Sequence, residues 1–184
     1  MSTGNQAGND QPNEVAPNQY RNTLEIDGEW YHVDVIDIAS PENSSEKQFA
    51  ENVKKADGFL LCYSITNKDT IESISNLHKL VKKIKKDDAQ FLLIGNKVDA
   101  KGDREVLYET GKKLAEELKM EFVEAAAKVP INVKFAETTL LKKMIRQRET
   151  LSAKQQAQQQ VKRKDQPMTP TTEKRVKKVP CNIS

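Results

Sequence analysis

Four consecutive residues near the middle of the chain, Asn96 to Asp99, bring an amide, an ammonium group and a carboxylate together. They follow the apolar run Gln90 to Gly95, which is typical of a strand buried on both faces. Ligands of open α/β sheets bind at the carboxyl ends of strands. The Asp99 carboxylate can accept two hydrogen bonds from the paired N–H groups on the edge of guanine, and adenine has no such pair. The aliphatic stem of Lys97 can lie along the face of a purine.

A second string, Ala126 to Lys128, follows the next expected strand, Glu121 to Ala125, and places small residues and a lysine on a loop. Taken alone, the first string also fits a polar turn in which Asn96 only holds loop backbone. The presence of the second string weakens that alternative.

Together the two strings resemble the N-K-x-D and E-x-S-A-K base-recognition motifs of the Ras superfamily of small GTPases. The segment Asp34 to Ser40 is similar to the second switch of that family, and Ala56 to Ile65 is similar to the strand after it. The turn at Glu25 to Glu29 resembles the hairpin turn before it, so the resemblance covers roughly Val15 to Met144. It implies one guanine-binding set: Asn96, Lys97, Asp99, Ala126, Ala127 and Lys128.

By the same resemblance, Asn96 and Asp99 would contact the base, Lys97 and Lys128 would flank it, and Ala127 would offer its backbone N–H. The serine of the second motif is replaced by alanine, which removes a hydroxyl but not a backbone donor. The bound ligand would be GTP or GDP with Mg²⁺.

The phosphate-binding loop of the family, G-x-x-x-x-G-K-[ST], does not occur in the 184 residues. The N–H groups and lysine of that loop cradle the phosphates, and its hydroxyl holds Mg²⁺. Losing about four charge-assisted hydrogen bonds of roughly 1.5–3 kcal/mol each would lower affinity by some four to nine powers of ten. We therefore expect weak or lost nucleotide binding and little or no GTP hydrolysis.

Three substitutions on the phosphate side agree with this expectation. By the resemblance, the threonine that ligates Mg²⁺ falls on Val15, the second-switch glycine on Ser40, and the glutamine that orients water on Pro41. Asp37 remains as the candidate Mg²⁺ ligand, and closing a strand is its alternative role. We assign no catalytic residue.

The chain ends in Cys181-Asn-Ile-Ser184, a C-a-a-X form whose last serine favours farnesylation of Cys181. One lipid chain anchors only marginally, and a polybasic patch supplies the second signal at an anionic leaflet. The basic residues upstream fit that role: Lys174, Arg175, Lys177 and Lys178. The expected location is the cytoplasmic face of the plasma membrane or an endomembrane. A nuclear-localisation or nucleic-acid role is the alternative, although no specific nucleic acid is expected.

The hydrophobic pattern predicts an α/β domain that opens with a hairpin, Tyr20 to Ile26 and Trp30 to Ile38, joined at Asp27-Gly28. Helices that alternate with strands then indicate a mostly parallel sheet with helices on both faces. They are expected at Glu46 to Lys55, Ile71 to Ile84 capped by Thr70, Glu105 to Leu118, and Val133 to Arg148. The resemblance makes this a P-loop-NTPase-like fold that lacks the first strand, the P-loop and the first helix.

Composition divides the chain into a disordered segment at 1–19, a partial Ras-like domain at 20–150 and a disordered basic tail at 151–184. From about Ser152 the Gln/Lys run, Gln155 to Gln160, suggests a helix extension that frays, with a solvated tail beyond it. Charged residues make up 31% of the chain and the net charge is +3, without a basic stripe on the part expected to fold. The two cysteines give no disulfide framework, and Cys62 is expected to be a buried core thiol.

The lack of the family's first strand predicts an interruption in the sheet. In the family sheet that first strand lies between the second hairpin strand and the strand Gly58 to Ile65. These two strands would close up, leave two inner edges open, or accept a strand of another chain. Three functions are compatible with the sequence: a degenerate Ras-like protein (a pseudo-GTPase), an active small GTPase whose N-terminal segment is absent from this sequence, and a basic-tailed interaction module. The sequence identifies no effector or regulator.

Overall fold

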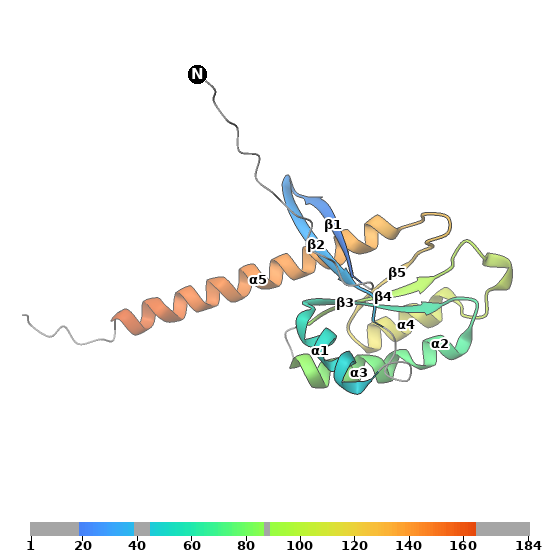
Figure 1. Cartoon of the computed structure of the whole chain (residues 1–184), viewed down its shortest axis with the longest axis horizontal. Coiled ribbons are helices and arrows are strands. Elements are labelled where there is room, and N and C mark those ends of the chain that lie inside the picture. Colours follow the sequence, from blue (N-terminus) through green and yellow to red (C-terminus); the bar gives the residue numbers. More distant parts are fainter. Residues whose placement is uncertain (1–18, 39–44, 87–88, 165–184) are drawn as a thin grey trace, which may run out of the picture. The chain divides into compact units, whose positions relative to one another are not determined.

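The computed structural model describes residues 19–38, 45–86 and 89–164. In this part of the chain the strands form two sheets, an antiparallel pair β1-β2 and a parallel sheet of order β3-β4-β5. The elements in chain order (Figure 1) are β1 (Gln19–Ile26), β2 (Glu29–Ile36), α1 (Glu46–Lys55), β3 (Gly58–Ser64), α2 (Lys68–Glu72), α3 (Ile74–Lys85), β4 (Gln90–Asn96), η2 (Lys101–Asp103), α4 (Tyr108–Glu117), β5 (Glu121–Glu124) and α5 (Val133–Lys164).

The predicted hairpin is confirmed. Asp27 and Gly28 have φ values of 53° and 88°, and two positive φ values are the mark of the tight turn that suits strand twist. In the resulting register Leu24 lies opposite Tyr31. Leu24 and Ile26 are buried against Leu141 of α5, so one face of the hairpin packs on that helix.

Strand β4 lies in the middle of the parallel sheet and is buried on both faces, as its continuous apolar run predicts. Phe91 and Leu93 face a core that includes residues of α1, α3 and α4. Leu92 and Ile94 face the other way, against Ala136 and Leu140 of α5. Figure 1 shows the same division, with α1, α3 and α4 on one side of this sheet. Helices therefore cover both faces.

Two expected helices differ from the structure. The helix capped by Thr70 divides into α2 and α3, and the cap is Asn67, whose side chain accepts from the Asp69 N–H at 2.9 Å. Thr70 was the wrong cap because its hydroxyl instead accepts from the Ser64 N–H at 2.9 Å. Helix α4 begins three residues after Glu105, since the Glu105 and Val106 N–H groups bond the Ile65 carbonyl at 2.8 and 2.9 Å.

The last helix, α5, continues to Lys164, past the predicted end at Arg148 and through the Gln/Lys run at which the sequence suggested a fraying extension. The chain divides into two compact units, Met1–Arg146 and Gln147–Ser184. In the second unit the described residues continue the helix. None of the described helices combines the length and the apolar character that crossing a membrane requires.

The expected gap is present in the described residues, because β2 pairs only with β1 and β3 pairs only with β4. Two inner edges are therefore left open. The prediction of a buried core thiol at Cys62 was wrong, since this residue presents surface to solvent. Protein atoms still surround the sulfur closely enough for burial, aided by the negative charge of Asp37, to raise the thiol pKa to about 11.

Candidate functional site

The loops that follow β4 and β5 are joined by backbone hydrogen bonds. The Val98 N–H donates to the Ala125 carbonyl at 3.2 Å, and the Ala125 N–H donates to the Gly95 carbonyl at 2.9 Å. Ala126 exchanges two further hydrogen bonds with Ile131, each 3.0 Å long. The fold thus brings the two predicted base-recognition strings side by side at the carboxyl ends of neighbouring strands.

The backbone turns sharply at Lys97, which has a φ of 70°, a left-handed conformation that costs a residue with a side chain roughly 1–2 kcal/mol. The Asn96 side chain compensates, because its Oδ1 accepts from the Lys97 N–H at 2.7 Å. Since a backbone N–H can only donate, the atom facing it is the oxygen. The NH₂ group of Asn96 therefore takes no part in this hydrogen bond.

The guanine-binding candidates differ in exposure. Val98 is buried and anchors the first loop, whereas Lys97 and Asp99 on either side of it are exposed. In the second loop Ala126 is fully buried, while Ala127 and Lys128 are exposed. The exposed Asp99 carboxylate and the Asn96 NH₂ group can meet the N–H and acceptor groups of a guanine, with the stems of Lys97 and Lys128 beside the ring.

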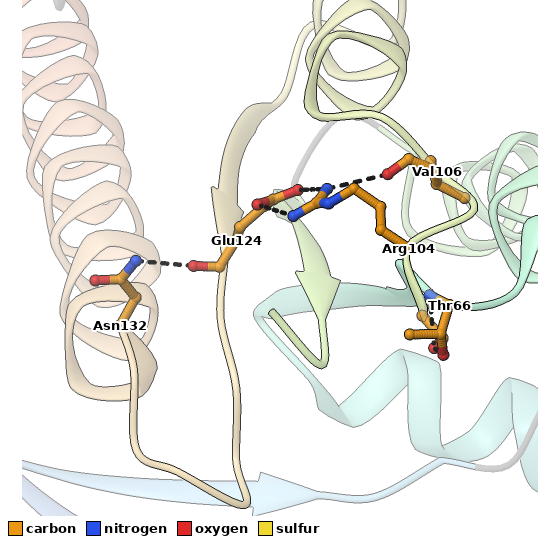
Figure 2. Close-up of polar contacts among 6 residues, drawn as sticks. Thr66, Arg104, Val106, Glu124 and Asn132 are labelled. Atoms are coloured by element: carbon orange, nitrogen blue, oxygen red, sulfur yellow. Dashed lines mark hydrogen bonds and ion pairs between the residues drawn. The ribbon is translucent and has the colours of Figure 1, made fainter. Parts of the chain in front are cut away.

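An ion pair that the sequence did not reveal connects the two loops (Figure 2). Arg104 donates from Nη1 to Oε1 of Glu124 at 2.6 Å and from Nη2 to Oε2 at 2.9 Å. Nη1 of Arg104 also donates to the Val106 carbonyl at 3.0 Å. The pair is mostly shielded from solvent, with side-chain exposures of 20% for Arg104 and 13% for Glu124. Hydrogen bonding to Glu124 raises the pKa of Arg104.

The same carboxyl residue also holds the start of α5. The Asn132 side chain donates from Nδ2 to the Glu124 carbonyl oxygen at 2.8 Å. The charge of Glu124 also acts on Tyr63. Burial, and then this negative charge, raise the pKa of Tyr63 to about 12. Its hydroxyl is buried and has no hydrogen-bond partner in the described part of the chain.

Of the remaining candidates, the structure describes only Asp37. Asp37 lies just after β2, and among residues 19–38, 45–86 and 89–164 no group of three acidic, histidine or cysteine side chains could hold a metal ion. Val15, Ser40, Pro41 and the lipidation and membrane candidates lie outside the described residues: Cys181, Lys174, Arg175, Lys177 and Lys178.

The fold defines a class, the α/β proteins with a parallel sheet covered by helices on both faces, and sequence comparison gives the family. A sequence model of the Ras family matches residues 5–146. The chain is 33% identical over 165 residues to Ras-like protein rasS of Dictyostelium discoideum, an alignment that covers 89% of this chain and 79% of that protein. The chain belongs to the Ras family.

Two other relatives are similar over shorter stretches. Ras-like protein 1 of Saccharomyces cerevisiae is 32% identical over 124 residues, covering 67% of this chain and 40% of the relative. Ras-like protein rasZ of Dictyostelium discoideum is 29% identical over 136 residues, covering 73% of this chain and 63% of the relative. The chain thus spans less than two thirds of the length of these two relatives.

Proposed function

We propose that this chain is a membrane-associated, Ras-like binding protein that recognises guanine and hydrolyses little or no GTP. Members of its family bind GTP or GDP with Mg²⁺. In this chain the base would be held by the six residues of the paired loops, and the phosphates would be held weakly. A farnesyl group on Cys181 and the basic residues before it would attach the protein to an anionic membrane surface.

The hydrogen-bonded contact between the two base-recognition loops carries this proposal. The loops are tied by backbone bonds between Val98 and Ala125 and by the Arg104–Glu124 pair. A random polar turn after β4 would not need a partner loop, whereas a base site does, because it must offer groups to opposite sides of one ring. Exposure of Asp99 beside the buried Val98 supports the same assignment.

The expectation of weak phosphate binding rests on the sequence. Pro41 has no N–H and no polar side-chain group, so it cannot orient an attacking water. Without the phosphate contacts, binding would depend on base contacts alone. The expected dissociation constant is then far above the micromolar range.

An NMR titration of the full-length chain with GDP tests this proposal, with ADP as the control nucleotide. GDP at millimolar concentration should shift the amide signals of Lys97, Asp99, Ala127 and Lys128, and ADP should leave them unchanged. No response to GDP would overturn base recognition. Submicromolar binding would overturn the weak phosphate side and favour an active GTPase.

The variant Asp99→Asn sharpens the test. Replacing the carboxylate with an amide turns one of the two hydrogen-bond acceptors into a donor. The amide no longer fits the paired N–H groups of guanine, but its NH₂ group can donate to the C2 carbonyl of xanthine. GDP affinity should fall about ten- to a hundredfold, the value of a charged hydrogen bond. Affinity for xanthosine diphosphate should rise. Equal affinities of wild type and variant for both nucleotides would show that Asp99 does not read the base.

A further inference from the structure

The loop between β5 and α5 is closed at its base by backbone hydrogen bonds. The Ala126 N–H donates to the Ile131 carbonyl, and the Ile131 N–H donates to the Ala126 carbonyl, each at 3.0 Å. Just beyond this closure the Asn132 side chain donates to the Glu124 carbonyl. Figure 2 shows the chain leaving β5 at Glu124 and returning at Asn132. The two ends of the loop are therefore fixed to each other and to β5.

Apolar side chains occupy the exposed part of this loop. Val129 is 53% exposed and Ile131 is 36% exposed, and Pro130 between them is also exposed. Phe135, in the first turn of α5, is 59% exposed. Single exposed apolar residues are normal on a protein surface, but several in succession form a patch. We call Val129, Pro130 and Ile131 the apolar tip.

Two lysines border the apolar tip, and the segment around it has no carboxylate. Residues 125–136 contain Lys128 and Lys134 but no Asp or Glu. Both lysines are exposed, and neither forms an ion pair with a described carboxylate. Glu124, at the base of the loop, is already paired with Arg104. The exposed surface of the loop is therefore apolar and positively charged.

We propose that the apolar tip contacts an anionic membrane surface. Val129 and Ile131 would enter the boundary between the lipid headgroups and the acyl chains, and Lys134 would meet the headgroups. Such interfacial binding grows with the apolar area buried and with attraction to anionic lipids. The attachment proposed above uses the tail, so this is a second contact, made by the folded domain. Of the tip and its lysines only Lys128 belongs to the candidate base site, so the contact does not depend on recognition of guanine.

The size and the chemistry of the patch favour a lipid surface over a protein. A stable protein–protein interface takes about 800 Å² and about 20–30 residues from each partner, more than one short loop offers. A bilayer needs no complementary shape, and its diffuse charge suits the flexible ammonium group of lysine. Pro130 has no N–H, and Ala126 and Ile131 satisfy each other's backbone groups. Contact with lipid would therefore remove water from few unpaired polar groups.

A fluorescent probe at Val129 tests this contact. The full-length chain carries Cys62→Ser, Cys181→Ser and Val129→Cys, so that an environment-sensitive nitrobenzoxadiazole group can be attached at the tip alone. The basic tail is kept, because it holds the protein near the surface and raises the local concentration of lipid. We expect the emission to shift to the blue and to rise severalfold on vesicles containing phosphatidylserine. Vesicles of phosphatidylcholine alone should cause neither change.

A matched probe and a matched charge separate insertion of the tip from general adsorption. A probe at Leu107→Cys reports on another exposed apolar position, before α4, and its emission should not change. In the unlabelled Cys181→Ser chain, Val129→Glu should lower the vesicle partition coefficient about tenfold, because it removes apolar area and adds a charge that an anionic surface repels. Leu107→Glu adds the same charge and should lower the coefficient much less.

The other outcomes each contradict the proposal. An unchanged spectrum of the Val129 probe on phosphatidylserine vesicles would show that the tip stays in water. Equal responses of the two probes, or equal losses in the two glutamate variants, would show adsorption without insertion. Equal responses to both lipids would show that the lysines do not select an anionic surface. A blue shift without lipid that grows with protein concentration would assign the tip to a second copy.

Neutralising the tail distinguishes this contact from the tail attachment. The chain with glutamine at Lys174, Arg175, Lys177 and Lys178 should keep weak binding to phosphatidylserine vesicles, and Val129→Glu should remove what remains. Weak binding that Val129→Glu does not change would contradict the role of the tip and leave the tail proposal standing.

Discussion

Arg104 and Glu124 connect the two loops that the base would contact, and they also stabilise the fold. Removing one partner leaves the other charge poorly solvated, because both side chains are mostly shielded. We expect Arg104→Ala to lower the free energy of unfolding by about 1–2 kcal/mol, the range for a charged hydrogen-bonded pair that keeps some contact with solvent. Urea denaturation measures this change.

A second ion pair provides the control. Arg21 also bonds an aspartate through two nitrogens, at 2.6 and 2.9 Å, but both side chains are exposed. Water screens such a pair, so Arg21→Ala should change the free energy of unfolding very little. A loss as large as that of Arg104→Ala would contradict our assignment of burial as the cause. Arg104→Lys should lie between the two, because lysine keeps the charge but cannot form the paired contact.

His78 makes the stability depend on pH. It is buried in α3 with its ring edge against Phe91, and its Nε2 has no hydrogen-bond partner in the described residues. Burial, and then the nearby charge of Lys82, lower its pKa below the ordinary 6.5. The folded state therefore binds this proton less readily than the unfolded state. The contribution of the neutral ring is complete above pH 6.5 and is lost as the pH falls through the lowered pKa.

Comparison of wild type with His78→Leu isolates this effect, since leucine cannot titrate. The free energy of unfolding of wild type should fall relative to the variant below pH 6.5, by at most about 1.4 kcal/mol per pH unit. Chemical denaturation at several pH values measures the difference. A difference that does not change between pH 7 and 5 would show that His78 takes up no proton on unfolding.

At the scale of elements, the packing of α4 against the sheet depends on a glycine. A Cβ at Gly111 would meet the Tyr63 hydroxyl and would lie 2.7 Å from Cζ of Phe122. Alanine favours a helix by about 1 kcal/mol over glycine, but forcing buried rings aside costs about 1–3 kcal/mol. We expect Gly111→Ala to be destabilising, as a lower midpoint of thermal unfolding would show.

Gly102 in η2 is the matched control, because a Cβ there would have no atom within 4 Å. Gly102→Ala should leave the melting temperature close to that of wild type. If both alanine variants melted like wild type, the close approach of α4 to Tyr63 and Phe122 would be disproved.

Elements with a strong local signal could be predicted from the sequence. Asp27-Gly28 between two alternating runs specified the hairpin, because its turn needs two positive φ values. The continuous apolar run of β4 specified a central strand buried on both faces. The positions of the two candidate base-recognition strings could be predicted for the same reason, since each string follows a strand whose end is clear in the sequence.

The remaining features depend on contacts between distant residues. Arg104 gave no signal, because its partner Glu124 lies 20 positions away and only the folded loops bring them together. Thr70 looked like a helix cap, but the end of β3 competes for its hydroxyl. Cys62 looked like a core residue because the apolar run of β3 suggested burial on both faces, whereas one face of that strand is uncovered.

At the scale of the whole molecule, the proposed lipid anchor on Cys181 would determine where the protein is found. Cys181→Ser removes the thioether carbon–sulfur bond that a farnesyl group would form, leaving only the basic residues to attract an anionic leaflet. We expect fluorescently tagged wild type on membranes and the variant released to the soluble fraction. The tag belongs on the N-terminus, since a C-a-a-X form must end the chain.

Replacing Lys174, Arg175, Lys177 and Lys178 with glutamine tests the second signal. Each basic residue near an anionic surface contributes about 1 kcal/mol, so this variant should also leave the membrane. A soluble distribution of wild type identical to that of Cys181→Ser would refute lipid attachment. A nuclear distribution lost only in the glutamine variant would support the nuclear-localisation alternative.

The separation of the two sheets has a consequence for how the molecule unfolds. In the described residues the hairpin and the parallel sheet share no strand pairing, so they are joined mainly through the side chains of α5. Cooperative opening follows such boundaries. The hairpin is then expected to open at a lower urea concentration than β3, β4 and β5. A single unfolding equilibrium constant would describe the parallel sheet and its helices, but not the chain as a whole. Arg104, His78 and Gly111 all belong to that part of the fold.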